Sequence, residues 1–129
     1  MALGSFVPRG DNRRVTMRAA GAINAGEAVK LGTNGVVVAG DGDTVYGFAA
    51  STAATGDTIA IYRSGRFSGT AATGFDPDMG DIIALAANHE VDGGSPGNVP
   101  LGVVIETDPA SGGTVVFEFN EGGVTTATL

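Results

Sequence analysis

Three short blocks of this sequence recur 54 to 56 residues further along the chain, and this repetition constrains the fold more than any other feature. The paired blocks are residues 26–31 with 80–85, 46–48 with 101–103 and 56–61 with 112–117. A unit of this size buries too little apolar surface to fold alone. We therefore expect two similar halves, residues 22–66 and 76–121, packed into one domain.

Apolar and polar residues alternate in several segments, which is the pattern of half-buried β-strands. In residues 114–120, Val115, Phe117 and Phe119 fall on one face and polar side chains fall on the other. The same alternation occurs in residues 15–19, 57–62 and 101–106. Glycine makes up 22 of the 129 residues and supplies tight turns between such segments. The sequence thus predicts an all-β fold, a small barrel or sandwich of short strands.

One segment, residues 81–87, fits two kinds of secondary structure. Its alanines and leucine favour a helix, which Asp81 would cap, and Ile82 and Leu85 would then share one face. A short apolar run fits a strand equally well. The repeat decides between them, because the segment aligns with residues 26–31, which have a strand pattern. We therefore predict a strand.

Three segments lie outside the two halves and have no periodic apolar face. They are an extended N-terminal arm at 1–14, a linker at 67–75 and a C-terminal tail at 122–129. The single β domain is expected to span residues 15–121. No run approaches the roughly 20 apolar residues that cross a bilayer, so no membrane partner is expected.

Charge is distributed unevenly along the chain. Seven basic and fourteen acidic residues give a net charge of −7, which disfavours a nucleic acid partner. Residues 1–30 nevertheless carry +3, so the remainder carries −10. The basic residues of this N-terminal region are Arg9, Arg13, Arg14, Arg18 and Lys30. We expect the region to bind an acidic protein surface.

The N-terminal arm combines apolar and basic residues in a form suited to docking. An extended segment of this kind can add a strand to the edge of a neighbour's sheet, while its arginines pair with carboxylates. The residues predicted to dock in this way are Phe6, Val7, Pro8, Arg9, Arg13, Arg14 and Arg18.

Few residues are suited to catalysis. The chain has no cysteine, and hence no disulfide, thiolate metal site or thiol nucleophile. The single histidine, His89, is predicted to lie solvated in a turn. The acidic loop with Asp76, Asp78 and Asp81 lacks the ligand spacing of an EF-hand. We expect no catalytic residues, no cofactor and no metal site.

Five blocks of the sequence carry a resemblance to a known family. They are residues 15–17, 25–29 followed by 35–38, 46–49, 56–60 and 100–104. In this arrangement, which spans residues 15–119, the chain resembles the capsid cement or head decoration proteins of tailed phages. The resemblance implies a non-enzymatic homotrimer on the outer surface of the virion head, assembled in the host cytoplasm. It also implies the major capsid protein as partner, with the trimer clamping neighbouring capsid subunits.

Two other functions are compatible with the sequence. A monomeric receptor- or carbohydrate-binding module of a phage fibre or bacterial surface protein would need an exposed aromatic platform. The chain has two tyrosines, six phenylalanines and no tryptophan to build one. A small metal-dependent hydrolase would instead use Asp76, Asp78, Asp81 and His89.

Overall fold

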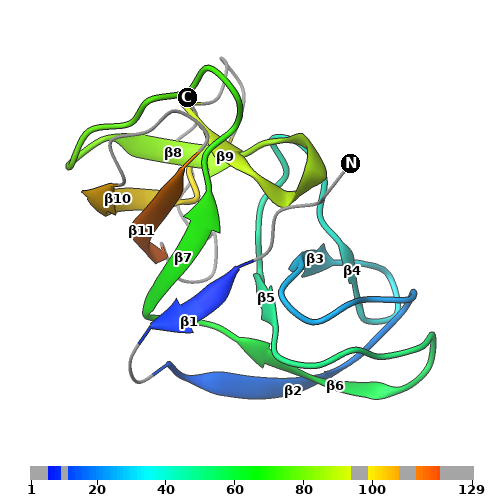
Figure 1. Ribbon diagram of the computed structural model, residues 1–129. Helices are drawn as coiled ribbons and strands as arrows, with labels where there is room; N and C mark the ends of the chain where they lie inside the picture. Colours follow the sequence, from blue (N-terminus) through cyan, green and yellow to red (C-terminus); the bar gives the residue numbers. More distant parts are fainter. Residues whose placement is uncertain (1–5, 10–11, 94–98, 108–112, 120–129) are drawn as a thin grey trace.

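The computed structural model describes residues 6–9, 12–93, 99–107 and 113–119. Within them, eleven strands form two antiparallel sheets that pack as a β-sandwich (Figure 1). The predicted all-β class is confirmed, and of the two predicted architectures the sandwich is the one observed. None of the described residues belongs to a helix long and apolar enough to cross a membrane.

Each sheet is built from one continuous part of the chain, apart from one added strand. The N-terminal sheet has the order β2–β6–β5–β3–β4. Its strands are β2 (Arg14–Arg18), β3 (Ala28–Leu31), β4 (Val36–Val38), β5 (Gly47–Ala49) and β6 (Thr58–Tyr62). The C-terminal sheet has the order β1–β7–β11–β10–β8–β9. Its strands are β1 (Val7–Arg9), β7 (Arg66–Thr70), β8 (Ile82–Leu85), β9 (Val91–Asp92), β10 (Gly102–Thr107) and β11 (Thr114–Phe119), with the 3-10 helix η1 (Ala87–His89) after β8.

The two sheets repeat one another strand for strand. Replacing β2 to β6 by β7 to β11 converts the order of the N-terminal sheet into that of the C-terminal sheet, which has β1 added at its edge. Backbone hydrogen bonds recur as well. The N–H of Gly26 donates to the carbonyl of Ala49 at 2.9 Å, and that of Gly80 to the carbonyl of Val104 at 2.8 Å. The expected two similar halves are present, and the ambiguous segment forms β8, as the repeat predicts.

The second half begins earlier than the sequence predicts. β7 takes the place that β2 takes in the first half, and it occupies the first residues of the predicted linker at 67–75. Phe67 of this strand is fully buried. The match escapes sequence comparison because β2 and β7 share only their first arginine and an alternating pattern.

The predicted N-terminal arm belongs to the sandwich where it is described. β1 pairs antiparallel with β7 of its own chain, instead of with the sheet of a neighbouring molecule. Phe6 is 3% exposed, and its ring centroid lies 4.5 Å from that of Phe48 and 5.9 Å from that of Phe117. Burial of this ring is the physical reason that the segment folds back. Residues 1–5 and 10–11, and the predicted tail at 122–129, lie outside the described residues.

Two clusters of buried side chains stabilise the sheets. The larger fills the space between them, where the ring centroid of Phe48 lies 4.5 Å from that of Phe67 and 4.9 Å from that of Phe119. The smaller lies on the opposite face of the N-terminal sheet and contains Ile59 and Ile61. The N-terminal sheet is therefore packed on both of its faces.

Two glycines at matching positions of the halves are required by close approach of the backbone. A Cβ atom on Gly47 would lie 2.3 Å from the carbonyl oxygen of Tyr62, and one on Gly102 would lie 2.1 Å from that of Glu118. Both distances are far below van der Waals contact, so no other residue fits without moving the strands. This constraint explains why glycine recurs in these two blocks of the sequence.

Replacing Phe6 with alanine tests whether β1 is part of the folded core. We expect Phe6→Ala to lower the free energy of unfolding by about 3 to 5 kcal/mol, because it leaves a cavity among buried aromatic rings. Urea denaturation followed by circular dichroism measures this change. Val7→Ala is the matched control, since Val7 is 51% exposed on the same strand and should change stability by less than about 0.5 kcal/mol. Equal losses in the two variants would show that β1 does not contribute to the core.

Candidate binding surface

The seven residues predicted to dock do not form one surface. Phe6 is buried and Pro8 is half-buried, so both belong to the packing of β1. Val7 and Arg9 are exposed on the outer face of the C-terminal sheet. The other three arginines are exposed at the N-terminal sheet: Arg13, Arg14 and Arg18. The structure thus separates the exposed members into two groups.

β2 presents the larger group of arginines. Its sequence alternates, so Val15 and Met17 pack against the smaller core cluster while Arg14, Thr16 and Arg18 are exposed. Among the described strands, only β6 pairs with β2, which makes β2 an edge strand (Figure 1). A bridge between Ala19 and Val36 closes this edge just beyond Arg18. Two arginines therefore flank a threonine along an edge of the N-terminal sheet.

The backbone groups of β2 alternate in the same way. The N–H of Arg63 donates to the carbonyl of Arg13 at 2.7 Å. The N–H of Ala19 donates to the carbonyl of Asp57, just before β6, at 2.8 Å. The odd-numbered residues of this antiparallel pair are thus the ones bonded to β6. The N–H and C=O groups of Arg14 and Thr16 point the other way, toward the edge of the sheet.

The arginines of β2 keep their charges available. The Arg14 guanidinium lies 5.9 Å from the centroid of the Tyr62 ring, a cation–π contact that orients it without neutralising it. Neither Arg14 nor Arg18 forms an ion pair within the part of the chain that the structure describes. Arg63, in contrast, stacks 3.8 Å over the Tyr46 ring and donates to the Tyr46 carbonyl, so it has a structural role.

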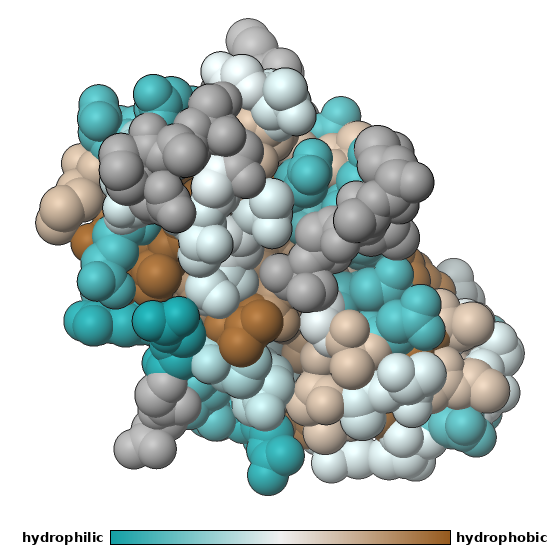
Figure 2. Space-filling view, viewed as in Figure 1, coloured by the Kyte–Doolittle hydropathy of each residue, from teal (hydrophilic) through white to brown (hydrophobic). Residues whose placement is uncertain are grey.

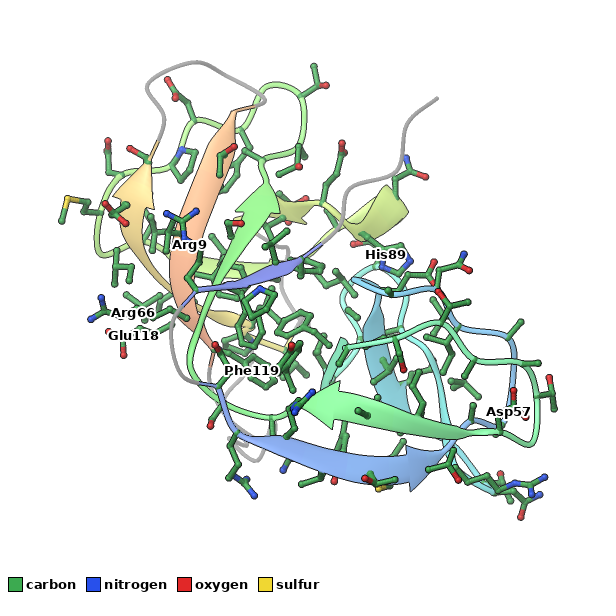
Figure 3. All side chains as sticks on the ribbon, turned by 60° about the horizontal axis from the view of Figure 1, so that its bottom comes forward. Arg9, Asp57, Arg66, His89, Glu118 and Phe119 are labelled. Carbon is green, nitrogen blue, oxygen red and sulfur yellow. The ribbon has the colours of Figure 1, made fainter. Side chains whose placement is uncertain are left out.

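The second group lies on the outer face of the C-terminal sheet. Arg9 is opposite Arg66, and Arg66 is opposite Glu118, so that all three side chains project from the same side of the sheet (Figure 3). Arg66 and Glu118 form an ion pair at 3.8 Å, which is largely exposed and contributes little to stability. The row continues across β10 and β8 with the exposed side chains of Val103 and Ile82. Figure 2 shows hydrophobic surface over β10 on this side of the molecule.

His89 does not lie solvated in a turn, as the sequence predicts. Its side chain is 8% exposed, and its Nε2 atom lies 3.3 Å from Oε2 of Glu27, which belongs to the other half of the molecule (Figure 3). The reason is the backbone of η1, where Asn88 and His89 have φ values of 63° and 57°. This left-handed turn directs the imidazole inward, against the N-terminal half.

The acidic loop residues have a turn-forming role. A carboxylate oxygen of Asp81 accepts the backbone N–H of Asp78 at 2.8 Å, just as the Glu27 carboxylate accepts the N–H of Asn24 in the first half. In the described residues, no three histidine, aspartate or glutamate side chains are grouped so as to hold a metal ion. His89 lies against Glu27, and the described residues do not group it with the three aspartates of the hypothetical hydrolase as a metal site would require.

An open hollow of about 310 Å³ lies beside β3 and contains one ion pair. Its lining residues are Lys30, Leu31, Asp43, Thr44 and Tyr46. Nζ of Lys30 donates to Oδ2 of Asp43 at 2.8 Å, and this hydrogen bond holds the pKa of the Asp43 carboxyl below its usual value. Partial burial opposes the shift, while the N–H of Gly40 adds to it. Since both charged groups are paired with each other, the hollow offers a partner little unpaired charge.

All eight aromatic side chains lie in the described residues, and none is exposed. Five phenylalanines are buried, and Phe75 and Tyr62 are partly buried against the same cluster. Tyr46 is covered on one face by Arg63. The aromatic platform that a carbohydrate-binding module needs is therefore not formed by these side chains.

Two comparisons with known proteins found a match, one in sequence and one in fold. A sequence model of the family described as phage cement protein matches residues 7–119. Among solved structures, the chain is similar to the base of head fiber gp8.5 in bacteriophage phi29, with a TM-score of 0.57 and 16% sequence identity. That match covers 85% of this chain and 95% of the phage chain, and at this identity it shows a shared fold. No curated protein matches the chain.

Asp43 provides a test of the ion pair beside β3. A lowered pKa in the folded state means that the pair stabilises the protein above the unfolded pKa, near 4, and that this contribution is lost as pH falls through the folded value. We expect Asp43→Asn to cost about 0.5 to 1 kcal/mol at pH 7, a modest amount because both side chains are part-exposed, and to cost less at about pH 2.5. Urea denaturation at the two pH values measures the difference.

Asp41→Asn is the control for this measurement. Asp41 is exposed and forms no ion pair or side-chain hydrogen bond within the described residues, so its variant should match the wild type at both pH values. A cost at Asp43 that is equally large at both pH values would show that the pair does not act through its charges.

Proposed function

Since the chain belongs to the phage cement protein family, we propose that it binds the outside of a phage head as a homotrimer and stabilises the contacts between major capsid subunits. Proteins of this family are structural components of the virion capsid and not enzymes. The observation that carries the proposal is the family match over residues 7–119, which covers both halves of the sandwich.

The proposed capsid contact consists of the two exposed groups of the predicted set. On β2 and just before it these are Arg13, Arg14 and Arg18, and on β1 they are Val7 and Arg9. Four of the seven basic residues of a chain with net charge −7 belong to these two groups. An acidic patch on the capsid would be attracted to these arginines, while the acidic remainder of the molecule would keep neighbouring particles apart.

Pro8 and Phe6 contribute to this surface indirectly. Pro8 is half-buried opposite Phe67, and Phe6 lies in the core. Together they fix β1 on β7, and so fix the position of Arg9. Deleting the N-terminal segment would therefore damage the fold as well as the contact, and substitution of single exposed side chains is the cleaner test.

A trimer would strengthen a contact that is weak in each copy. Three linked arginine surfaces bind as a unit, because the second and third contacts form at a high effective concentration once the first is made. Such avidity would compensate for the modest binding free energy that each exposed arginine contributes.

Removing two arginines tests the proposed capsid surface. We expect Arg13→Ala combined with Arg14→Ala to raise the Kd for expanded heads by at least about 10-fold and to make binding less dependent on salt. Cosedimentation with purified heads at several salt concentrations measures both effects. Lys30→Gln combined with Thr73→Glu lowers the net charge by the same two units at positions outside both groups and should bind nearly as wild type. An equal loss in the control would mean that binding follows net charge and not these arginines.

Electron cryomicroscopy of decorated heads tests the proposed stoichiometry. We expect density for three copies around each occupied threefold position, corresponding to about 38 kDa, three times the 12.7 kDa chain. Isolated single copies on the shell, with no contact between them, would contradict the trimer while leaving capsid binding intact.

A further inference from the structure

We propose that the edge of β2 binds an extended acidic segment of a partner protein, which joins the N-terminal sheet as an additional antiparallel strand. The inference rests on the proposed function in one respect, since the segment is taken to belong to a capsid subunit. The site is the backbone of Arg14 and Thr16, whose N–H and C=O groups point away from β6, together with the side chains of Arg14 and Arg18.

The other half of the molecule already shows this mode of binding. In β7, the residues bonded to β11 are odd-numbered, because Phe119 N–H donates to the Gly65 carbonyl at 3.0 Å and Ala71 N–H donates to the Gly113 carbonyl at 2.9 Å. The alternate residue Arg66 therefore directs its backbone groups toward the edge of the sheet.

β1 occupies that edge of β7. It lies antiparallel, with Arg9 opposite Arg66 and Val7 opposite Ser68. Because β2 is the counterpart of β7, Arg14 and Thr16 take the positions of Arg66 and Ser68. The same type of edge is thus occupied in one half, whereas in the described residues of the other half nothing pairs with it.

A proline distinguishes the outer edge of β1, which cannot accept a further strand, from the edge of β2, which can. Pro8 lies opposite Phe67, which is bonded to β11, so the nitrogen of Pro8 faces away from β7. A proline at this position leaves the β1–β7 ladder intact and removes the donor that a further strand would need. β2 contains no proline, and its outward N–H at Thr16 keeps the edge competent for pairing.

Charge selects the kind of strand that fits. A second copy of β2 would bring Arg14 and Arg18 against arginines, and this repulsion disfavours pairing between two molecules of this chain. Directly opposed residues share a face of the sheet, so an acidic residue opposite Arg14 would form a cross-strand pair, and one opposite Thr16 would lie diagonal to Arg18. Both guanidinium groups have no ion pair in the described residues.

On the other face of β2, apolar residues of an added strand would fit best. Val15 and Met17 are only half-buried at the margin of the smaller core cluster. Apolar side chains of an added strand would cover them and extend that cluster. The segment that fits therefore alternates acidic with β-branched apolar residues. It pairs with residues 14–17, because Gly35 lies against the carbonyl of Arg18 and a bridge joins Ala19 to Val36.

Peptide titration of the full-length protein, followed by amide NMR, tests the edge without capsids. The probe is the synthetic peptide acetyl-TEVEVET-amide, and acetyl-TKVKVKT-amide is its charge-reversed control. We expect the acidic peptide to shift the amide signals of Arg14, Thr16 and Arg18, to slow exchange of the Arg14 and Thr16 amides, and to bind at least about 10-fold more tightly than the basic peptide.

Two substitutions at one position separate the backbone from the side chain. Thr16→Pro removes the outward N–H, as Pro8 does in β1, and should abolish peptide binding while Thr16→Ala retains it. Far-ultraviolet circular dichroism checks that the proline variant is folded. Should it not fold, Arg14→Glu with Arg18→Glu provides the second test, because this variant should prefer the basic peptide.

The outcomes distinguish this inference from the proposed function. Peptide binding that is undetectable, that persists in a folded Thr16→Pro variant, or that ignores peptide charge would overturn the inference. So would Arg14 and Thr16 amides already protected in the free protein, since another segment of the chain would then occupy the edge. If Thr16→Pro binds heads as well as Thr16→Ala does, capsid binding stands and strand addition is wrong. If the peptide binds but heads do not, the edge stands and the cement function is wrong.

Discussion

The contact between Phe48 and the aromatic rings of the C-terminal sheet is the interaction on which the sandwich depends. Phe48 is contributed by the first half, and its ring centroid lies within 4.5 to 6.1 Å of those of Phe6, Phe67, Phe117 and Phe119. Aromatic side chains bury more surface than any other type, and this cluster joins the two sheets and the N-terminal strand at one point. Without it, the two halves would lose the surface that holds them together.

The position of Phe48 also makes the halves unequal. Its counterpart in the second half is Val103, and the counterpart of Ala28 is Ile82. Phe48 and Ala28 are buried beneath the C-terminal sheet, whereas Val103 and Ile82 are exposed on the outer face. The duplicated sheets therefore stack with the same face turned in the same direction. Each repeated surface is therefore covered in one half and uncovered in the other. The edges differ in the same way, since β1 covers the edge of β7 while no described strand covers that of β2.

The strands with strong alternation or with glycines at repeated positions could be predicted from the sequence, and so could the exposure of Arg14 and Arg18. The role of β7 could not, because its sequence shares only its first arginine and a general strand alternation with β2. Burial of Phe6 was also beyond prediction, since an apolar extended segment fits the edge of its own sheet as well as that of a neighbour. The burial of His89 could not be predicted either, because it depends on the left-handed turn and on Glu27, which is distant in sequence.

The placement of Phe6 couples two strands that are distant in sequence. This ring packs against Phe117 of β11, so Phe6 finds its complete environment only after β11 has left the ribosome. β2 to β6 can pair earlier, since their partners are nearer in sequence, but Phe48 then stays uncovered until the later strands arrive. Folding during translation would thus proceed with an apolar surface exposed, which β1 and β11 cover together in a late step.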